Sequence, residues 1–145
     1  MSETNKDITV AFYKMAVFEG RVEDAFRLYA GTPYRQHNPL IEDGMEGLKK
    51  FFAGILSNHP DARGEIKRVF ADGDHVILHS HWHGLSDNSR GEAVVDIFRL
   101  EGGKVLEHWD VSSQSRKRRP TPTRCSELRR QPARAGENRR SPPSR

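Results

Sequence analysis

Ionisable side chains alternate with apolar residues in two neighbouring stretches of the sequence. Asp96 lies in one run of β-branched and aromatic residues, and His108 and Asp110 lie in the next. Such groups are costly to bury unless they are paired or line a cavity. Burial among apolar residues is expected to raise the pKa of Asp110, which would suit it to remove a proton next to a carbonyl group. His37 or His108 could then donate a hydrogen bond to the oxyanion that forms.

The same residues allow two other interpretations. Asp110 could simply hydrogen-bond a histidine in a domain that binds a small molecule without converting it, because binding needs only a concave apolar site with a few fixed polar groups. Alternatively, His79, His81 and His83 share one face of a predicted strand. With the carboxylate of Asp96, they have the atom types of a metal site. Alternate strand residues are about 6.6 to 7 Å apart, so three histidines in a row bind one ion only with strain. We therefore expect no metal and no cofactor.

The two acids and His108 lie on a predicted β-hairpin that spans residues 94–111. A shift of one residue in the strand pairing would move every side chain to the other face of the sheet. We favour a three-residue loop with a bulge at Gly103, which pairs Asp96 with His108 and leaves both acids and the histidine on one face. The alternative is a two-residue Gly-Gly turn, which would pair Asp96 with Trp109 and separate the two acids.

The other face of this hairpin is expected to be apolar. It would carry Val95, Ile97, Val105, Trp109 and Val111, interrupted by Arg99 and Glu107. A sheet with a polar pocket on one side and an apolar surface on the other is suited to association with a second copy. We therefore predict a homodimer.

The segments before the hairpin predict the elements that position it. Apolar residues recur at helical spacing over residues 5–18, 22–29 and 46–57, and strand patterns follow over residues 63–70 and 74–83. Residues 34–39 form a short polar connection. Within it, Pro39 restricts Asn38 to extended geometry, which could hold Asn38 and His37 in place. Three helices followed by consecutive antiparallel strands predict an α+β fold, in which the helices cover one side of a curved sheet.

Four of these segments together resemble the SnoaL-like branch of the nuclear transport factor 2-like superfamily. They are Tyr34-Arg35-Gln36-His37-Asn38-Pro39, the strand around His79, Val95-Asp96-Ile97-Phe98-Arg99, and residues 103–110. The resemblance runs from about residue 5 to Gln114. It implies a cone-shaped fold, in which three N-terminal helices pack on a curved antiparallel sheet around a deep pocket. The superfamily contains cyclases, isomerases, dehydratases and proteins that only bind ligands, so the resemblance does not identify a reaction.

The resemblance also implies roles for individual residues. In the cyclases of this branch, an aspartate of the last strand acts as acid and base in an intramolecular aldol condensation, with a nearby histidine assisting. Asp110 matches that aspartate, and His108 and His37 are the candidate histidines. The pocket polar residues of the family fall on His37, Asn38, His79, Asp96 and His108. The expected ligand contacts are Asn38, His79 and Asp96, together with His81 and Phe98, which the resemblance does not single out. The expected ligand is a small hydrophobic or carbonyl-containing molecule.

The basic residues are concentrated in the last part of the chain. Residues 1–114 carry 13 Lys and Arg against 18 Asp and Glu, whereas residues 115–145 carry 11 against 2. We therefore expect an acidic SnoaL-like domain over residues 1–114 and a disordered, basic, Arg- and Pro-rich tail over residues 115–145. The composition of the tail resembles that of a GC-rich gene translated out of frame. Because the positive charge is confined to the tail, nucleic acid is not an expected partner.

The cysteine count and the hydropathy pattern bear on the cellular location. The one cysteine, Cys125, lies in the tail, so an intrachain disulfide is excluded. No apolar run approaches the length needed to span a bilayer, and the N-terminal residues are polar. We expect a cytoplasmic protein without a membrane segment.

Overall fold

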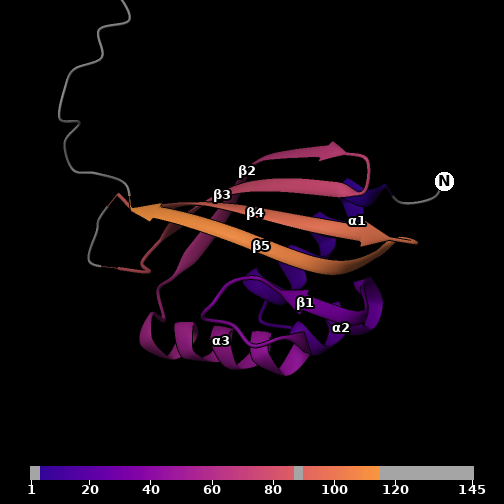
Figure 1. Cartoon of the computed structure of the whole chain (residues 1–145). Coiled ribbons are helices and arrows are strands. Elements are labelled where there is room, and N and C mark those ends of the chain that lie inside the picture. Colours follow the sequence, from indigo (N-terminus) through magenta and orange to yellow (C-terminus); the bar gives the residue numbers. More distant parts are fainter. Residues whose placement is uncertain (1–3, 87–89, 115–145) are drawn as a thin grey trace, which may run out of the picture.

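The computed structural model describes residues 4–86 and 90–114, which form helices and strands in the order shown in Figure 1. The helices are α1 (Asn5–Tyr13), α2 (Val22–Tyr29) and α3 (Gly44–Asn58), and a π-helical turn, η1, covers Lys14–Phe18. The strands are β1 (Ala30–Gln36), β2 (Arg63–Asp72), β3 (His75–His83), β4 (Glu92–Glu101) and β5 (Lys104–Gln114). None of the helices in this part of the chain is long and apolar enough to cross a membrane. The tail predicted over residues 115–145 lies outside the described residues.

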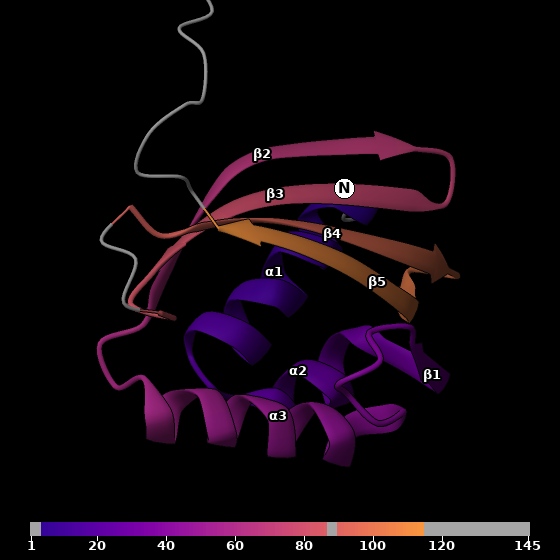
Figure 2. The same cartoon turned by 60° about the vertical axis from the view of Figure 1, so that its left-hand side comes forward.

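The helices form one layer and the sheet forms the other. Strands β2 to β5 make a curved antiparallel sheet, and the helices lie together on its concave side (Figures 1 and 2). The strand order is β1-β5-β4-β3-β2. β1 pairs with β5 in parallel and is not predicted by the sequence, because its Ala-Gly-Thr-Pro start has little β propensity. The predicted α+β class is confirmed.

Local interactions set the limits of the first helix. Thr4 caps α1 through a capping box, in which its hydroxyl accepts the backbone N–H of Asp7 at 3.3 Å. In return, the Asp7 carboxylate accepts the backbone N–H of Thr4 at 3.2 Å. At Lys14 the helix changes into a π-helical turn, where the N–H of Glu19 bonds to the Lys14 carbonyl at 3.0 Å. The predicted helix over residues 5–18 is therefore correct in extent but not in its last turn.

The β4–β5 hairpin combines a tight turn with a separate bulge. Gly102 and Gly103 both have positive φ angles, 57° and 74°, so they form a two-residue primed turn. Farther along β5, the pairing skips Leu106, which is the extra residue of a β-bulge. The hairpin therefore contains both of the features that the sequence presented as alternatives.

The observed register differs from both predicted registers. Asp96 pairs with Asp110, and Phe98 pairs with His108. The favoured register, with Asp96 opposite His108, is wrong because the turn has two residues, with Glu101 paired to Lys104, and the extra residue, Leu106, lies in β5. One extra residue anywhere in β5 before His108 shifts the later side chains to the opposite face. The two acids and the histidine therefore still share the inner face, as in the favoured register. Val105, expected on the outer face, precedes the bulge and is fully buried in the core.

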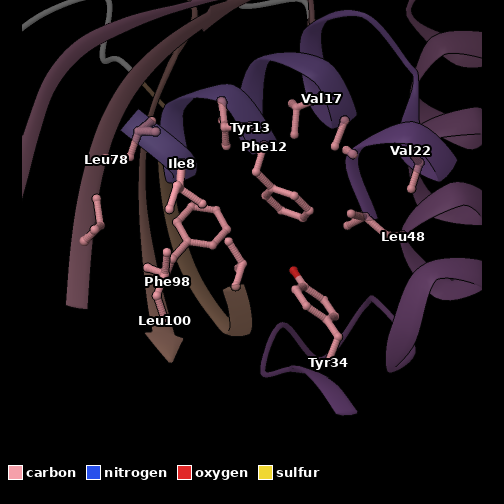
Figure 3. Close-up of a cluster of buried hydrophobic side chains, with 14 of the residues drawn as sticks. Ile8, Phe12, Tyr13, Val17, Val22, Tyr34, Leu48, Leu78, Phe98 and Leu100 are labelled. Atoms are coloured by element: carbon pink, nitrogen blue, oxygen red, sulfur yellow. The ribbon is translucent and has the colours of Figure 1, made fainter. Parts of the chain in front are cut away.

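The core lies between the helices and the concave face of the sheet. Phe12 is at its centre, with ring centroids 5.6 Å from Phe26, 6.1 Å from Tyr34 and 6.0 Å from Phe98. In Figure 3, Tyr34 from β1 points across the interior towards Phe12 and Phe98. The aliphatic part of this core includes Ile8, Val22, Leu48, Val76, Leu78 and Leu100. Tyr34 thereby anchors β1 to the main core.

The convex face of the sheet carries a row of apolar side chains. Phe70, Ile77, Ile97 and Trp109 are successive neighbours across β2, β3, β4 and β5. Phe70 is 56% exposed, and Val111, in the next row, is 69% exposed. These exposures agree with the apolar outer face expected for the hairpin, apart from Val105.

The primed turn gives a prediction for stability. Gly102 has a positive φ, and no heavy atom lies within 4 Å of the position where a Cβ would stand. Gly102→Asn should leave the free energy of unfolding within about 0.5 kcal/mol of wild type, because Asn tolerates the left-handed region in this turn. Gly102→Val should lower it by about 1 to 2 kcal/mol, because a β-branched residue does not. Urea unfolding measures both values, and equal effects would contradict the assigned turn.

Candidate functional site

A cavity of about 270 Å³ opens between α3 and the concave face of the sheet. Its apolar wall includes Phe51, Phe52, Ile55, Trp82, Leu85 and Val94. The polar lining residues are Tyr13, Asn38, His59, Glu92, Asp110 and Ser112. A concave, mostly apolar space with a few polar groups is the usual form of a small-molecule site.

A smaller cavity of about 50 Å³ lies deeper in the core. The two cavities are adjacent, because both are lined by Tyr13, Val17, Phe51, Phe52 and Asp110. Tyr13 and Asp110 are the polar members of this shared set. The inner cavity is also lined by His108. A ligand that fills the larger cavity and reaches into the smaller one would therefore pass Asp110 and Tyr13.

Asp110 is held at one oxygen and unpartnered at the other. Asn38 Nδ2 donates a hydrogen bond to Asp110 Oδ2 at 2.9 Å. The orientation of the Asn38 amide is fixed, because its Oδ1 accepts the backbone N–H of Leu40 at 2.8 Å, and only an oxygen can accept that bond. Asp110 Oδ1 is buried and has no hydrogen-bond partner among the described residues. The carboxylate is thus oriented, while one oxygen remains available to a ligand.

Gln36 fixes the other end of the site. Its Oε1 accepts the backbone N–H of Asn38 at 3.0 Å and lies 2.9 Å from His108 Nδ1. Because a backbone N–H can only donate, Oε1 is the acceptor atom of this amide, and His108 Nδ1 carries a proton. Asp43 is placed to cap α3, but its Oδ1 instead accepts the backbone N–H of Gln36 at 2.7 Å. Side-chain hydrogen bonds therefore hold the connection between β1 and α3 in place.

His108 and Asp96 form a buried pair that shares one proton. His108 Nε2 lies 2.9 Å from Asp96 Oδ1, and the two residues are 6% and 4% exposed. Because Nδ1 of the ring is already protonated, this contact needs one further proton, either on Nε2 or on the carboxyl group. Both arrangements leave the pair without net charge. The pair of His108 and Asp96 therefore does not neutralise the neighbouring Asp110 carboxylate.

Burial raises the pKa of Asp96 above its ordinary value, while the hydrogen bond and charge of His108 act in the opposite direction. The neighbouring charge of Asp110 raises it further. Asp96 Oδ2 is buried and has no hydrogen-bond partner within the described part of the chain, which adds to the cost of ionising the group. Burial therefore favours the protonated form of the Asp96 carboxyl group.

The structure brings five of the predicted site residues together. They are Asn38, Asp96, Phe98, His108 and Asp110. The ring of Phe98 stacks on that of His108 with centroids 4.6 Å apart and lines the inner cavity. Strand alternation explains the grouping, because even-numbered residues of β4 and, after the bulge, of β5 face inwards.

His37 does not reach the cavity, although it is a predicted catalytic residue. It follows Gln36 in extended chain, and its ring stacks on Trp109 of the convex face at a centroid distance of 4.5 Å. Its Nε2 lies 3.4 Å from a carboxylate oxygen of Glu107, on the same side. The expectation that His37 lies in the cavity is therefore corrected. A residue that donates to a ligand in the cavity must lie on the concave face, and His37 lies on the convex face.

His79 and His81 also lie on the convex face. The buried positions of β3 are even-numbered, so these odd-numbered histidines point away from the cavity. His79 Nδ1 lies 2.8 Å from an Arg68 guanidinium nitrogen, and His81 Nε2 lies 2.8 Å from the Arg90 carbonyl oxygen. Their expected contact with a ligand in the cavity is corrected for this reason. Residues 4–86 and 90–114 contain no group of three or more His, Cys, Asp or Glu side chains placed to hold a metal ion.

Some site residues escape the sequence reasoning. Gln36 shares a face with Asn38 by strand alternation, which is a signal that could have identified it. Tyr13 has the spacing of an ordinary core residue in an amphipathic helix. Phe51, Phe52 and Trp82 are likewise spaced as core residues, and their side chains line the cavity. Sequence spacing is the same for a side chain that fills a core and for one that walls a cavity.

Residues 9–108 match the model of the SnoaL-like domain, and the chain belongs to this family. The resemblance inferred from the sequence motifs is therefore confirmed. The matched segment contains Asn38, Asp96 and His108 and ends two residues before Asp110.

Solved structures show that the fold is NTF2-like. A candidate polyketide cyclase from Acidithiobacillus ferrooxidans is 22% identical with a TM-score of 0.60, and the match covers 79% of this chain and 91% of that one. A candidate polyketide cyclase from Bacillus cereus is 22% identical with a TM-score of 0.65, covering 75% and 74%. An NTF2-like protein of unknown function from Cytophaga hutchinsonii is 15% identical with a TM-score of 0.60, covering 78% and 93%. At these identities the likeness establishes the fold alone. The sequence has no significant match among curated proteins.

The buried pair gives a prediction for pH dependence. Because the pKa of Asp96 is raised in the folded protein, the native state keeps this proton at pH values where the unfolded chain has lost it. The stability that Asp96 contributes should therefore fall as the pH rises from about 4, the ordinary pKa of an aspartate. Asp96→Asn removes this titration and keeps an amide that can bond to His108. The unfolding free energy of wild type relative to Asp96→Asn should decrease between pH 4 and 8 in urea titrations, and parallel pH profiles would contradict the raised pKa.

Proposed function

We propose that the protein is a small-molecule enzyme of SnoaL-like type that performs acid–base chemistry next to a carbonyl group, with Asp110 as the base. The observation that carries this proposal is the placement of the Asp110 carboxylate. It lines both cavities, one oxygen is oriented by Asn38, and the other is buried without a partner among the described residues. A base must be oriented and still have a free lone pair, and this carboxylate meets both conditions.

The proposed step is the same for several reactions. Asp110 Oδ1 takes a proton from the carbon next to the carbonyl, the C–H electrons form the carbon–carbon double bond of an enolate, and negative charge moves to the carbonyl oxygen. The enolate then attacks a second carbonyl in an aldol cyclisation, is reprotonated elsewhere in an isomerisation, or expels a leaving group in a dehydration. The candidate polyketide cyclases among the structural neighbours fit the first of these reactions.

His108 has a supporting role in this proposal. Both of its ring nitrogens are already engaged, Nδ1 with Gln36 and Nε2 with Asp96. It therefore does not donate directly to the ligand in this arrangement. With Asp96 it forms a pair without net charge next to Asp110, and this pair does not neutralise the Asp110 carboxylate.

The cavity supports a small ligand with an apolar body. Aromatic and aliphatic side chains form most of the wall of the larger cavity. Glu92, His59 and Ser112 add polar groups that a hydroxyl or second carbonyl of the ligand can reach. A bicyclic ketone such as 2-tetralone has these properties and serves as a probe.

The proposal predicts exchange of the protons next to the carbonyl of 2-tetralone in deuterated water. Asp110→Asn should slow the enzyme-dependent exchange by at least about 100-fold, because an amide cannot accept the proton. Mass spectrometry of the recovered ketone measures the rate. Asp74→Asn is a matched control, because this carboxylate is exposed in the β2–β3 turn and should leave the rate unchanged.

Two outcomes would contradict the enzymatic proposal. Equal exchange rates for wild type and Asp110→Asn would exclude Asp110 as the base. If wild type binds 2-tetralone but does not accelerate exchange, the alternative function is favoured, which is a domain that binds a small molecule without converting it.

We further propose that the protein is a homodimer that associates through the convex face of the sheet. The apolar row from Phe70 to Trp109 and the exposed Val111 support this assembly. Burying such side chains against a second copy removes apolar area from water and stabilises the dimer by about 25 cal/mol per Å² before the costs of association.

A charge on this face should therefore dissociate the dimer. Val111→Arg should give a monomeric mass by light scattering at micromolar concentration, whereas wild type should give a dimeric mass. Leu56→Arg is the control, because Leu56 is also exposed, at 46%, but lies on α3 and should leave the dimer intact. A monomeric wild-type protein would refute the assembly.

A further inference from the structure

Two polar side chains of the larger cavity, His59 and Glu92, have no part in the proposed reaction. Both line the larger cavity, and neither lines the smaller one. Both residues are partly buried. Their side chains take part in none of the hydrogen bonds or ion pairs found among the described residues. These groups are therefore available to a ligand, and their position relative to Asp110 decides which part of the ligand they can reach.

The lining residues follow the same order along three elements, from the smaller cavity to the outer part of the larger one. In this order they are Leu48, Phe52 and His59 on α3, Phe98, Val94 and Glu92 on β4, and His108, Asp110 and Ser112 on β5. In both views of the fold, α3 runs alongside these two strands (Figures 1 and 2). The two cavities therefore form one elongated space, and His59 and Glu92 lie at the end farthest from the smaller cavity.

The geometry of these elements gives the length of the space. His59 follows Phe52 by seven residues at the end of α3, which corresponds to about 10 Å along a helix. Asp110 pairs with Asp96, and Glu92 lies four residues from Asp96 on β4, which is about 13 Å along a strand. A ligand that reacts at Asp110 therefore needs an extended body to place a second polar group at Glu92.

The charges of the lining favour a cation at this outer end. Among the described residues that line either cavity, Asp110 and Glu92 carry the carboxyl groups, and none is Lys or Arg. An anionic group would be repelled by Glu92 and would find no cation to bind. A hydroxyl can donate a hydrogen bond to Glu92, whereas an ammonium group adds the attraction between opposite charges to that bond.

The location of Glu92 also limits the cost of binding a cation. Glu92 is the first residue of β4 and is only partly buried, so an ammonium group bound to it stays partly hydrated. Complete burial would be much more costly. Between Glu92 and Asp110, the wall is apolar and includes Ile55, Trp82 and Val94. This middle part suits the uncharged body of a ligand.

We propose that Glu92 determines specificity by binding a protonated amine of the ligand at the outer end of the cavity, while the ketone group of the same ligand lies at Asp110. This inference rests on the proposed function of Asp110 and names its substrate class. The expected substrates are amino ketones with a rigid apolar body between the amine and the carbonyl group. His59 lines the same end and can supply a second acceptor when its ring is neutral.

The first test compares two ligands of the same shape. 6-(Dimethylaminomethyl)-2-tetralone is a cation at neutral pH, and 6-isobutyl-2-tetralone is its uncharged counterpart. Glu92→Gln should weaken binding of the cation by about five- to tenfold, because the amide has the size of the carboxylate without its charge. It should change the Kd of the uncharged ketone by less than about twofold. Titration calorimetry measures both constants.

Glu101→Gln is the matched control for this test. Glu101 lies at the other end of β4, is exposed and lines neither cavity, so its substitution should leave both Kd values unchanged. An unchanged affinity of Glu92→Gln for the cation would overturn the proposal. Equal losses for both ligands would also overturn it, because they would assign Glu92 to packing. If Asp110→Asn alone weakens binding of the cation relative to the uncharged ketone, the amine binds at Asp110 and the proposal is wrong.

Proton exchange in deuterated water separates this inference from the proposed function. With the cationic ketone, Glu92→Gln should raise KM by about five- to tenfold and change kcat by less than about twofold, because the contact with the amine is the same in the ground state and the transition state. A lower kcat with both ketones would overturn the role in specificity, because it would place Glu92 at the reacting carbon.

The two tests fail independently. If Glu92→Gln weakens binding of the cation but wild type catalyses no exchange, the Glu92 contact is supported and the proposal for Asp110 fails. If exchange depends on Asp110 while Glu92→Gln leaves the KM of the cationic ketone unchanged, the inference about Glu92 alone is overturned.

Discussion

One extra residue in β5 decides which face of the sheet carries the candidate site residues of that strand. The pairing of β4 with β5 skips Leu106, so His108 and Asp110 turn inwards together with Asp96 and Phe98. Without that bulge, the two-residue turn would direct His108 and Asp110 to the convex face. The same bulge lets Val105, an odd-numbered residue, contribute to the core. The bulge therefore serves both the packing of the hairpin and the placement of the acids.

The Asp96 and Asp110 carboxylates lie side by side under a layer of helices, which has an electrostatic cost. Two features of the site reduce this cost. Asp96 shares a proton with His108, so that pair carries no net charge. Asp110 is hydrogen-bonded by Asn38 and borders the larger cavity. Gln36 links the two parts, because its side-chain oxygen contacts both His108 and the backbone of Asn38. The connection between β1 and α3 is thus a structural part of the site.

The sequence predicts those parts of the fold that follow from local patterns. The helices, the β4–β5 hairpin and the α+β class all follow from spacing and turn residues, and the motif around Asp110 points to the right family. The position of the bulge is not predictable, because a bulge in the turn and one at Leu106 give the same alternation. β1 is missed because its pairing with β5 is long-range and its residues have little β propensity. The outward position of His79 and His81 could have been predicted. These histidines alternate along β3 with Val76, Leu78 and Trp82, which are more apolar and are therefore the residues expected to face the core.

The central claim is that Asp110 acts as a base on a carbonyl compound bound at the junction of the two cavities. A crystal structure of the protein with 2-tetralone tests it most directly, because it locates the oxygen and the adjacent carbon of the same molecule. The account predicts that the carbon next to the carbonyl group lies in contact with Asp110 Oδ1. A ketone bound with the carbons next to its carbonyl group away from Asp110, or bound on the convex face, would contradict it.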